Sequence, residues 1–245
     1  MKTSIVLIML LSVSIGRIAA SDDPDKEQLL KQTITNHILA HGGMEVWNKV
    51  TALALKGEHM TFSVVHDFYT LKTADGRFYS EYNLGHHRLT EVYNGTDYWS
   101  LNPWYETGDP IPMNDAERNV IRQKALFFSP FYPILAEQPD IEWLGNHEAD
   151  GMELVALSVS YPDMPAETWY LDAGTFLTYK VESQWIDFSS PVMAETYFDD
   201  YRQVDGIVLP FYIEQTYGTR HTVTQITTVE INPEIAPELF EKPSD

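Results

Sequence analysis

Residues 195–213 read ETYFDDYRQVDGIVLPFYI, and this stretch decides the fold class. The apolar side chains after Asp205-Gly206 fall on every second position, at Ile207, Leu209, Phe211 and Ile213. That period of two is typical of a β-strand with one buried face. The Asp-Gly dipeptide suits a tight hairpin turn, because both residues tolerate a positive φ. The stretch therefore predicts two antiparallel strands joined by a hairpin.

The same pattern recurs along most of the chain. Short runs rich in aromatic and β-branched residues occupy 53–60, 62–72, 77–83, 87–93 and 97–102, and strand-like runs resume at Ile141. Turn signals separate these runs at Asp75-Gly76, Asn94-Gly95, Asp150-Gly151, Ala173-Gly174, Asp205-Gly206 and Gly218. Such spacing predicts about eleven antiparallel strands. A sheet of that length curls or closes, so we predict a mainly β fold, a curved antiparallel sheet that forms a half-open barrel covered by a few helices.

Two helical segments interrupt the strand pattern. Asp23-Pro24 is a favourable helix start, and the segment that follows carries apolar residues at helical spacing until Gly42-Gly43 ends it. A short turn of helix is expected over 45–50. Asn114 with Glu117 three residues later predicts a capped helix that continues towards Pro130. We expect these helices to cover the concave side of the sheet.

The first twenty residues have the features of a secretory signal peptide. Lys2 gives a positive start, an apolar run follows over 5–11, and Ile18-Ala19-Ala20 is a small-residue exit before Ser21. We expect cleavage after Ala20 and export to the periplasm. No linker or repeat divides the remainder, so residues 21–245 are predicted to form a single domain.

The charge balance excludes some partners. The chain has 36 Asp and Glu against 16 Lys and Arg, a formal net charge of −20. Such a charge disfavours nucleic acid and anionic membrane surfaces. No second long apolar run is present, so we expect no stable membrane insertion. We expect the protein to be a soluble monomer.

Sequence motifs for catalysis or metal binding are missing. There is no cysteine, hence no thiol nucleophile, thiolate metal site or lipid attachment point. No phosphate-binding glycine loop and no Gly-x-Ser-x-Gly elbow occur. His147-Glu148 lacks a second histidine, and His86 and His87 point to opposite faces of a strand. We therefore expect no catalytic residue, no metal and no cofactor.

Aromatic residues are the remaining functional signal. The chain has six Trp, 14 Tyr and 11 Phe, interleaved through most of the expected strands, with one group near the second helical segment. They either line an apolar cavity or pack an ordinary core. On the first reading, the candidate ligand-binding residues of the cavity and its lid are Leu30, Ile34, Ile38, Trp99, Leu101, Trp104, Phe127, Phe128 and Phe131.

Several local motifs stand out along the chain. They are Gly42-Gly43 with Trp47, the strand end at Lys56-Gly57, the run from Tyr197 to Pro210, the ending Val229-Glu230-Ile231-Asn232-Pro233, and Leu239-Phe240 with Pro243. Together they resemble the LolA-like family of periplasmic lipoprotein carriers. None of these pieces is a catalytic signature.

The resemblance implies a half-open barrel closed by helices around a hydrophobic cavity that shelters acyl chains. The sequence departs from the family in one respect: the family's carriers use a gating arginine near the cavity mouth, and no motif here identifies it, so Arg77 and Arg88 are candidates by position only. We therefore expect a non-catalytic carrier or binding protein for a lipid acyl chain or a lipidated protein. Two alternatives stay open: an enzyme acting on a small apolar substrate in the cavity, and an envelope-assembly interaction module with a filled barrel.

Overall fold

The computed structural model describes residues 24–103, 109–127, 129–132, 138–162, 164–187 and 190–243. The expected signal peptide over 1–20 lies outside the described residues, as do the helix cap Asp23 and the candidate ligand-binding residues Trp104 and Phe128.

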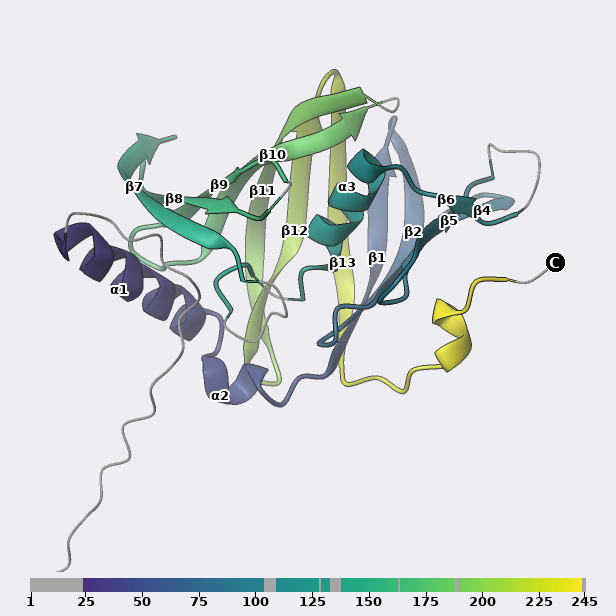
Figure 1. The fold of residues 1–245 in the computed structure, drawn as a ribbon, viewed down its shortest axis with the longest axis horizontal. Coiled ribbons are helices and arrows are strands. Elements are labelled where there is room, and N and C mark those ends of the chain that lie inside the picture. The colour runs from purple at the N-terminus through teal and green to yellow at the C-terminus, as the bar shows by residue number, and fades with distance from the viewer. Residues whose placement is uncertain are drawn as a thin grey trace, which may run out of the picture.

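One antiparallel sheet of thirteen strands dominates the described chain (Figure 1). In chain order the strands are β1 (Ala52–Thr61), β2 (Val64–Thr73), β3 (Phe78–Leu84), β4 (His87–Tyr93), β5 (Tyr98–Leu101), β6 (Ile111–Pro112), β7 (Asp140–Ala149), β8 (Met152–Ser160), β9 (Glu167–Asp172), β10 (Thr178–Asp187), β11 (Ser190–Val204), β12 (Ile207–Tyr217) and β13 (Arg220–Ile231).

The order across the sheet is β6-β5-β4-β3-β2-β1-β13-β12-β11-β10-β9-β8-β7. Only the β1–β13 pair joins strands that are distant in sequence, with Leu53 opposite Ile231. β6 and β7 form the two edges in the described chain, so the sheet is strongly curved but not closed (Figure 1).

The expected mainly β architecture is therefore confirmed, while the expected count of eleven strands is too low. The prediction relied on glycine-containing turns, and β6 has only two residues. In addition, β10 and β11 follow each other across residues 187–190, where the sequence has no glycine.

Four helical segments accompany the sheet in the described residues: α1 (Pro24–Ala40), α2 (Met44–Trp47), α3 (Asp115–Ala125) and the 3-10 turn η1 (Pro237–Phe240). The expected capping box of α3 is present. The Asn114 side chain accepts a hydrogen bond from the Glu117 backbone N–H, and the Glu117 carboxylate accepts one from the Asn114 N–H. The box satisfies two backbone donors at the start of the helix.

Helix α3 lies across the concave face of the sheet (Figure 1). It contacts β3 and β4 on one side and β10 on the other. Ile121 and Ala125 are buried against Phe78 of β3. The expected continuation of the helix through Phe127 is wrong, because Leu126 leaves helical geometry with ψ near 119° and ends α3 at Ala125.

Helix α1 fills the β7–β9 end of the concave side. Leu30, Ile34 and Ile38 face one core cluster together with Val155 and Leu157 of β8. A second cluster lies on the opposite face of the sheet, where Phe240 of η1 packs over Leu71, Tyr79 and Trp99. Both ends of the described chain thus cover the sheet, one on each face.

The α1–α2 junction is held against the β11–β12 hairpin. Gly42 has φ near +108°, and a Cβ atom there would lie 2.2 Å from the carbonyl oxygen of Gly206. The Val208 N–H donates to the His41 carbonyl at 3.1 Å, and Trp47 Nε1 donates to the same carbonyl at 2.8 Å. Only glycine allows so close a backbone contact at a positive φ.

Asn232 connects the end of β13 to the start of β1. Its Oδ1 atom accepts hydrogen bonds from the Thr51 N–H at 2.6 Å and the Ala52 N–H at 3.3 Å, and its Nδ2 atom donates to the Lys49 carbonyl at 2.9 Å. Several of the residues that carry the family resemblance therefore hold the elements of the fold together.

Candidate functional site

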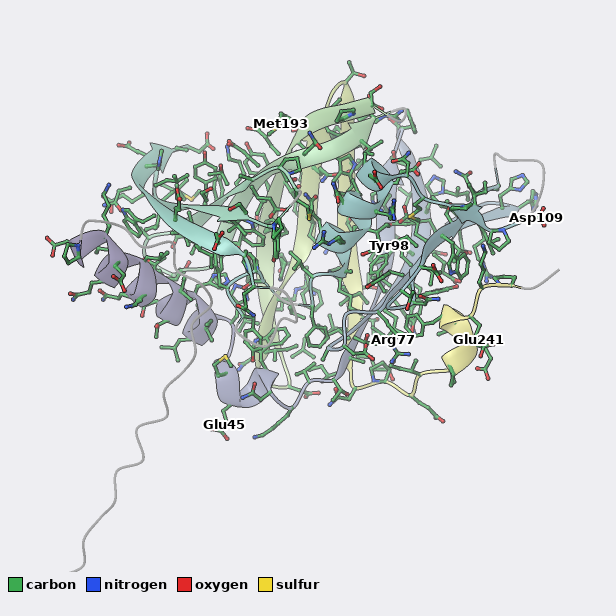
Figure 2. The ribbon with its side chains drawn as sticks, in the orientation of Figure 1. Glu45, Arg77, Tyr98, Asp109, Met193 and Glu241 are labelled. Carbon is green, nitrogen blue, oxygen red and sulfur yellow. The ribbon has the colours of Figure 1, made fainter. Side chains whose placement is uncertain are left out.

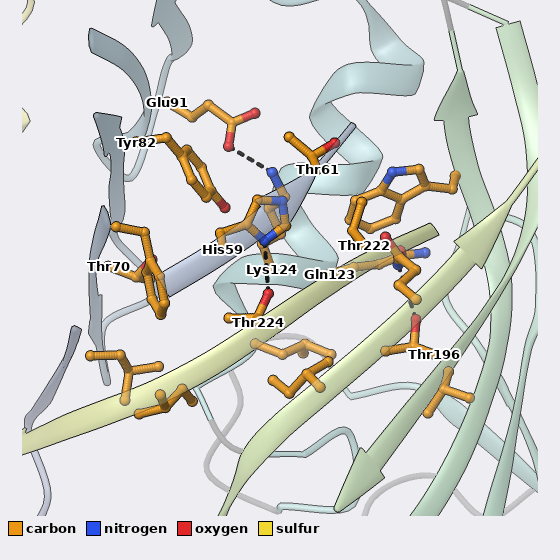
Figure 3. A pocket seen from close by; sticks show the side chains of 18 of the residues that line it. His59, Thr61, Thr70, Tyr82, Glu91, Gln123, Lys124, Thr196, Thr222 and Thr224 are labelled. Atoms are coloured by element: carbon orange, nitrogen blue, oxygen red, sulfur yellow. Dashed lines mark hydrogen bonds and ion pairs between the residues drawn. The ribbon is translucent and has the colours of Figure 1, made fainter. Parts of the chain in front are cut away.

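A cavity of about 460 Å³ lies between α3 and the concave face of the sheet, partly open to solvent (Figure 3). Strands β1–β4 line one side and strands β9–β13 the other, and Gln123, Lys124 and Leu126 border it from α3 and the residue that ends it. Its apolar wall consists of Leu55, Phe68, Phe78, Leu84, Leu89, Leu126, Trp169, Val181, Trp185, Phe198, Ile213 and Ile226. The volume falls within the range of small-molecule sites.

Strand alternation explains which side chains reach the cavity. On β2 the lining residues are His66, Phe68, Thr70 and Lys72, every second position of the strand. The intervening Tyr69 and Leu71 belong to the cluster on the opposite face. Successive side chains of a strand point to opposite faces, so this one register sets the composition of the β2 wall.

Hydroxyl, amide and imidazole groups interrupt the apolar wall. The His59 ring Nδ1 atom lies 2.8 Å from Thr224 Oγ1, and Gln215 Nε2 donates to Thr196 Oγ1 at 3.0 Å (Figure 3). Burial, and after it the neighbouring Lys124, lowers the pKa of His59 to about 4. His59 is therefore a neutral side chain at pH 7.

An ion pair joins the helix to the cavity wall. Lys124 Nζ lies 2.6 Å from Glu91 Oε2, and the two side chains are only 23% and 18% exposed. The ammonium also lies 5.8 Å from the Tyr82 ring centroid and 5.6 Å from that of Trp185. Burial lowers the pKa of Lys124, but the charge and hydrogen bond of Glu91, together with Tyr82 and Tyr217, outweigh it and the net shift is upward. Lys124 stays charged.

A second lysine lines the cavity without such a partner. Lys72 Nζ donates to the Leu126 carbonyl at 3.1 Å, and no carboxylate of the described chain is paired with it. Burial, followed by the nearby charge of Lys124, lowers the pKa of Lys72 to about 8. Lys72 is consequently still mostly charged at neutral pH.

Glu167 is the second carboxylate in the lining. It is 3% exposed, and its Oε2 atom accepts a hydrogen bond from Trp169 Nε1 at 2.7 Å. Burial raises the pKa of its carboxyl group, although hydrogen bonds from Trp169 and Gln123 partly oppose this. The position of Glu167 in the wall is thus fixed by its neighbours on β9 and α3.

Exposed apolar side chains lie beside one end of the cavity, at the β1–β2 turn and the start of β2. Thr61 and His66 line it, and between them the β1–β2 turn carries Phe62, 70% exposed, with Val64 and Val65 also exposed. The Arg220 guanidinium lies 4.4 Å from the Phe62 ring centroid. Met193 of β11 is also exposed (Figure 2), but it pairs with Gln184, which lies between the lining residues Ser183 and Trp185, so it points to the opposite face of the sheet.

The candidate residues from the sequence lie elsewhere. Leu30, Ile34 and Ile38 are buried in the core between α1 and β8, and Phe127 and Phe131 belong to the same cluster. Trp99 and Leu101 pack under η1 on the opposite face of the sheet. None of these seven described residues lines the cavity.

The sequence analysis did not identify the residues that line the cavity, because their sequence pattern is weak. The lining positions of β2 alternate, but they mix His, Phe, Thr and Lys and lack an apolar stripe. The positional candidates for a gating arginine also lie outside the lining. The guanidinium of Arg77 (labelled in Figure 2) lies 4.6 Å from the ring centroid of Phe240 in η1. The exposed Arg88 forms an ion pair with Glu81, with 3.2 Å between Nη1 and Oε2.

No group of three or more His, Asp or Glu side chains in the described residues is arranged to hold a metal ion. Within the same residues, no helix has the length and hydropathy needed to cross a membrane.

The similarity of this chain to known proteins is found in its structure. No protein-family model and no curated protein matches the chain. A LolA superfamily protein from Nitrosomonas europaea superimposes with a TM-score of 0.60 at 12% identity, over 86% of this chain and 97% of that one. This chain has the LolA-like fold.

Two further structures share the LolA-like fold. A domain from Vibrio parahaemolyticus, assigned to outer membrane lipoprotein sorting, has a TM-score of 0.53 at 11% identity over 86% of this chain and 95% of that one. A DUF1329 family protein from Desulfovibrio piger has a TM-score of 0.58 at 11% identity, with 86% and 96% covered. The LolA-like resemblance of the sequence motifs is confirmed for the fold.

Proposed function

We propose that this LolA-like protein is a non-catalytic carrier that shelters an acyl chain of a lipid or of a lipidated protein in its cavity. The observation that carries the proposal is the cavity of about 460 Å³ with a largely apolar wall beneath α3. Each buried methylene of a ligand contributes roughly 0.8 kcal/mol, so even a partly sheltered chain binds usefully. The match to a domain assigned to outer membrane lipoprotein sorting supports the same class of ligand.

The cavity lining defines the ligand contacts in this proposal. Phe68, Phe198, Ile213 and Ile226 come from four different strands and would contact the acyl chain. The sequence-derived candidates of α1 would act indirectly, by closing the β7–β9 end of the concave side. An open cavity argues against the filled-barrel alternative.

The enzyme alternative has less support. Catalysis by a general base needs a titratable group within hydrogen-bond reach of a reacting atom. Glu91 is engaged by Lys124, and Glu167 by Trp169. Neither arrangement resembles a nucleophile activated by a base.

Extraction and binding measurements test the carrier proposal. Mass spectrometry of an organic extract of the purified protein should detect acyl species, and a fluorescent fatty acid should bind with saturation. Ile213→Trp adds bulk to the cavity wall and should reduce this binding at least about tenfold. The control is Leu39→Trp, since Leu39 is 64% exposed on α1. An empty extract together with no uptake of the fluorescent fatty acid would overturn the proposal.

We also propose export to the periplasm, with residues 1–20 removed as a signal peptide and residues 21–245 released as a single domain. The charged start, apolar run and small-residue exit support this. N-terminal sequencing of the protein from a periplasmic fraction should begin at Ser21. An intact Met1 in the cytoplasmic fraction would contradict it.

A further inference from the structure

We infer that the cavity selects acyl ligands with an anionic head group, a carboxylate or a phosphate, and that Lys72 binds that head group. This inference rests on the proposed carrier function and deepens it by naming the chemical class of the ligand.

The first argument is the distribution of charge within the cavity. The chain as a whole is strongly acidic, with a net charge of −20. Its cavity lining nevertheless contains two lysines, Lys72 and Lys124, against Glu91 and Glu167. Glu91 is neutralised by Lys124 at 2.6 Å. That pairing leaves Lys72 as the cation that an anionic ligand can approach.

The second argument is the hydrogen bonding of Lys72. An ammonium group has three N–H donors, and the described chain supplies one acceptor, the Leu126 carbonyl at 3.1 Å. A partly buried charge without a counter-ion is costly. A ligand carboxylate or phosphate would supply both the missing charge and further acceptors. Charge-assisted hydrogen bonds of that kind are about twice as strong as neutral ones.

The third argument is the shape and polarity of the lining around Lys72. Lys72 is opposite Phe78 in the β2–β3 register, and Phe68 lies four residues before it on the same face. The lining continues along β2 to His66, a distance of about 20 Å at the usual rise per residue. The site therefore has a cation at one end of this strand, Phe68 farther along it, and apolar side chains of other strands in the same lining, which suits an elongated amphiphile.

Glu167 does not compete with this assignment. Its carboxylate is held by Trp169 Nε1 at 2.7 Å, and no ion pair joins it to Lys72 in the described residues. His59 bonds to Thr224 and is not a cation at neutral pH. Lys72 is thus the group in the lining on which selectivity for an anion depends.

Competition binding at pH 7 tests the inference on the unmodified protein. Oleate, lysophosphatidate and the uncharged monoolein are compared for displacement of a fluorescent acyl probe. Oleate or lysophosphatidate should bind at least about tenfold tighter than monoolein. The stronger of the two acids identifies a carboxylate or a phosphate as the preferred head group. Equal affinity for all three ligands would overturn the inference and leave the carrier function intact, whereas no binding at all would overturn the carrier function itself.

Substitution of Lys72 provides the second measurement. Lys72→Met should remove the preference for the acids and leave monoolein binding unchanged, while Lys72→Arg should retain the preference. The control is Lys56→Met, since Lys56 lies exposed on the neighbouring β1 and outside the lining. A loss in Lys72→Met that is equal for monoolein and the acids would indicate a structural role and overturn the inference.

Discussion

Lys124 Nζ of α3 lies 2.6 Å from Glu91 Oε2 of β4, and this ion pair connects the helix to the sheet beside the cavity. Ile121 and Ala125 of the same helix pack on Phe78 of β3, and α3 also contacts β10. The helix thus bridges two distant parts of one curved sheet. Its attachment determines how firmly the cavity is covered.

Replacing Glu91 with Gln should destabilise the protein. The change leaves the partly buried ammonium of Lys124 without its counter-charge, which costs about 1–3 kcal/mol at this degree of exposure. Urea unfolding at pH 7 measures the loss. Glu58→Gln, at an exposed position of β1, should have little effect.

A double-mutant cycle isolates the ion pair. Lys124→Met combined with Glu91→Gln should be less destabilising than the two single changes added together, by about 1 kcal/mol. Additive effects would show that the two groups do not interact, contrary to the geometry.

Short-range sequence signals were sufficient to predict several helices and strands of the fold. The Asn114–Glu117 capping box, the α1 stripe and the Asp205-Gly206 hairpin each act within a few residues, so the sequence alone identified them. The C-terminal end of α3 was predicted less accurately, since Leu126 departs from helical geometry before any proline.

The cavity was not predictable in the same way. Alternation indicates that Trp99 and its neighbour Tyr98 point to opposite faces, but not which face is concave. That depends on the pairing of β1 with β13, residues about 170 positions apart, and on where α3 and η1 pack. The sequence prediction therefore selected aromatic and aliphatic residues, while the cavity is lined by a mixture of apolar and polar ones.

Leu30→Asp is expected to unfold the protein rather than only weaken ligand binding. Leu30 is 3% exposed within the main core cluster, and a buried carboxylate there would have no partner in that apolar cluster. The loss should be at least about 3 kcal/mol. Its neighbour Leu29 is 45% exposed, so Leu29→Asp is the matched control and should leave thermal unfolding nearly unchanged. Equal stability of the two variants would show that α1 is not packed against β8.

Gly42→Ala tests the contact between the α1–α2 junction and the β11–β12 hairpin. A Cβ atom would combine a φ near +108° with a 2.2 Å approach to the Gly206 carbonyl oxygen. The expected loss is at least about 2 kcal/mol.

Gly76→Ala is the control for backbone strain alone. Gly76 has φ near +88°, but nothing lies within 4 Å of its Cβ position. Its loss in urea unfolding should be clearly smaller, about 1 kcal/mol. If the two variants lose equal stability, the close approach of Gly42 to Gly206 contributes nothing.

Acid should destabilise the protein through two buried histidines, His37 of α1 and His41 just after the helix. The His37 and His41 rings lie 4.6 Å apart, and both side chains are almost fully buried. His41 Nδ1 donates to the Val208 carbonyl at 2.7 Å, and His37 Nδ1 donates to the Phe176 carbonyl at 2.9 Å. Burial lowers the pKa of His41 to about 4, and burial together with His41 lowers the pKa of His37 well below its usual value.

The sign of the effect follows from the two states of the chain. Unfolded histidines titrate near pH 6.5, so between about pH 6.5 and 4 the unfolded chain binds protons that the native state does not. The contribution of the two uncharged histidines to the free energy of unfolding is fully present above that window. It is lost as the pH falls through the window. For His41 alone the loss amounts to about 3 kcal/mol at pH 4. His59 adds to it in the same window.

Urea unfolding between pH 7 and pH 5 measures this dependence before most carboxylates titrate. His41→Asn keeps a donor for the Val208 carbonyl but removes the titrating ring. The slope of unfolding free energy against pH, expressed as the difference in protons bound by the unfolded and native states, should therefore fall by up to one. His87→Asn, at an exposed position of β4, is the control and should keep the wild-type slope. An unchanged slope in His41→Asn would mean that the buried ring takes up its proton in the native state, and that His41 does not limit stability in acid.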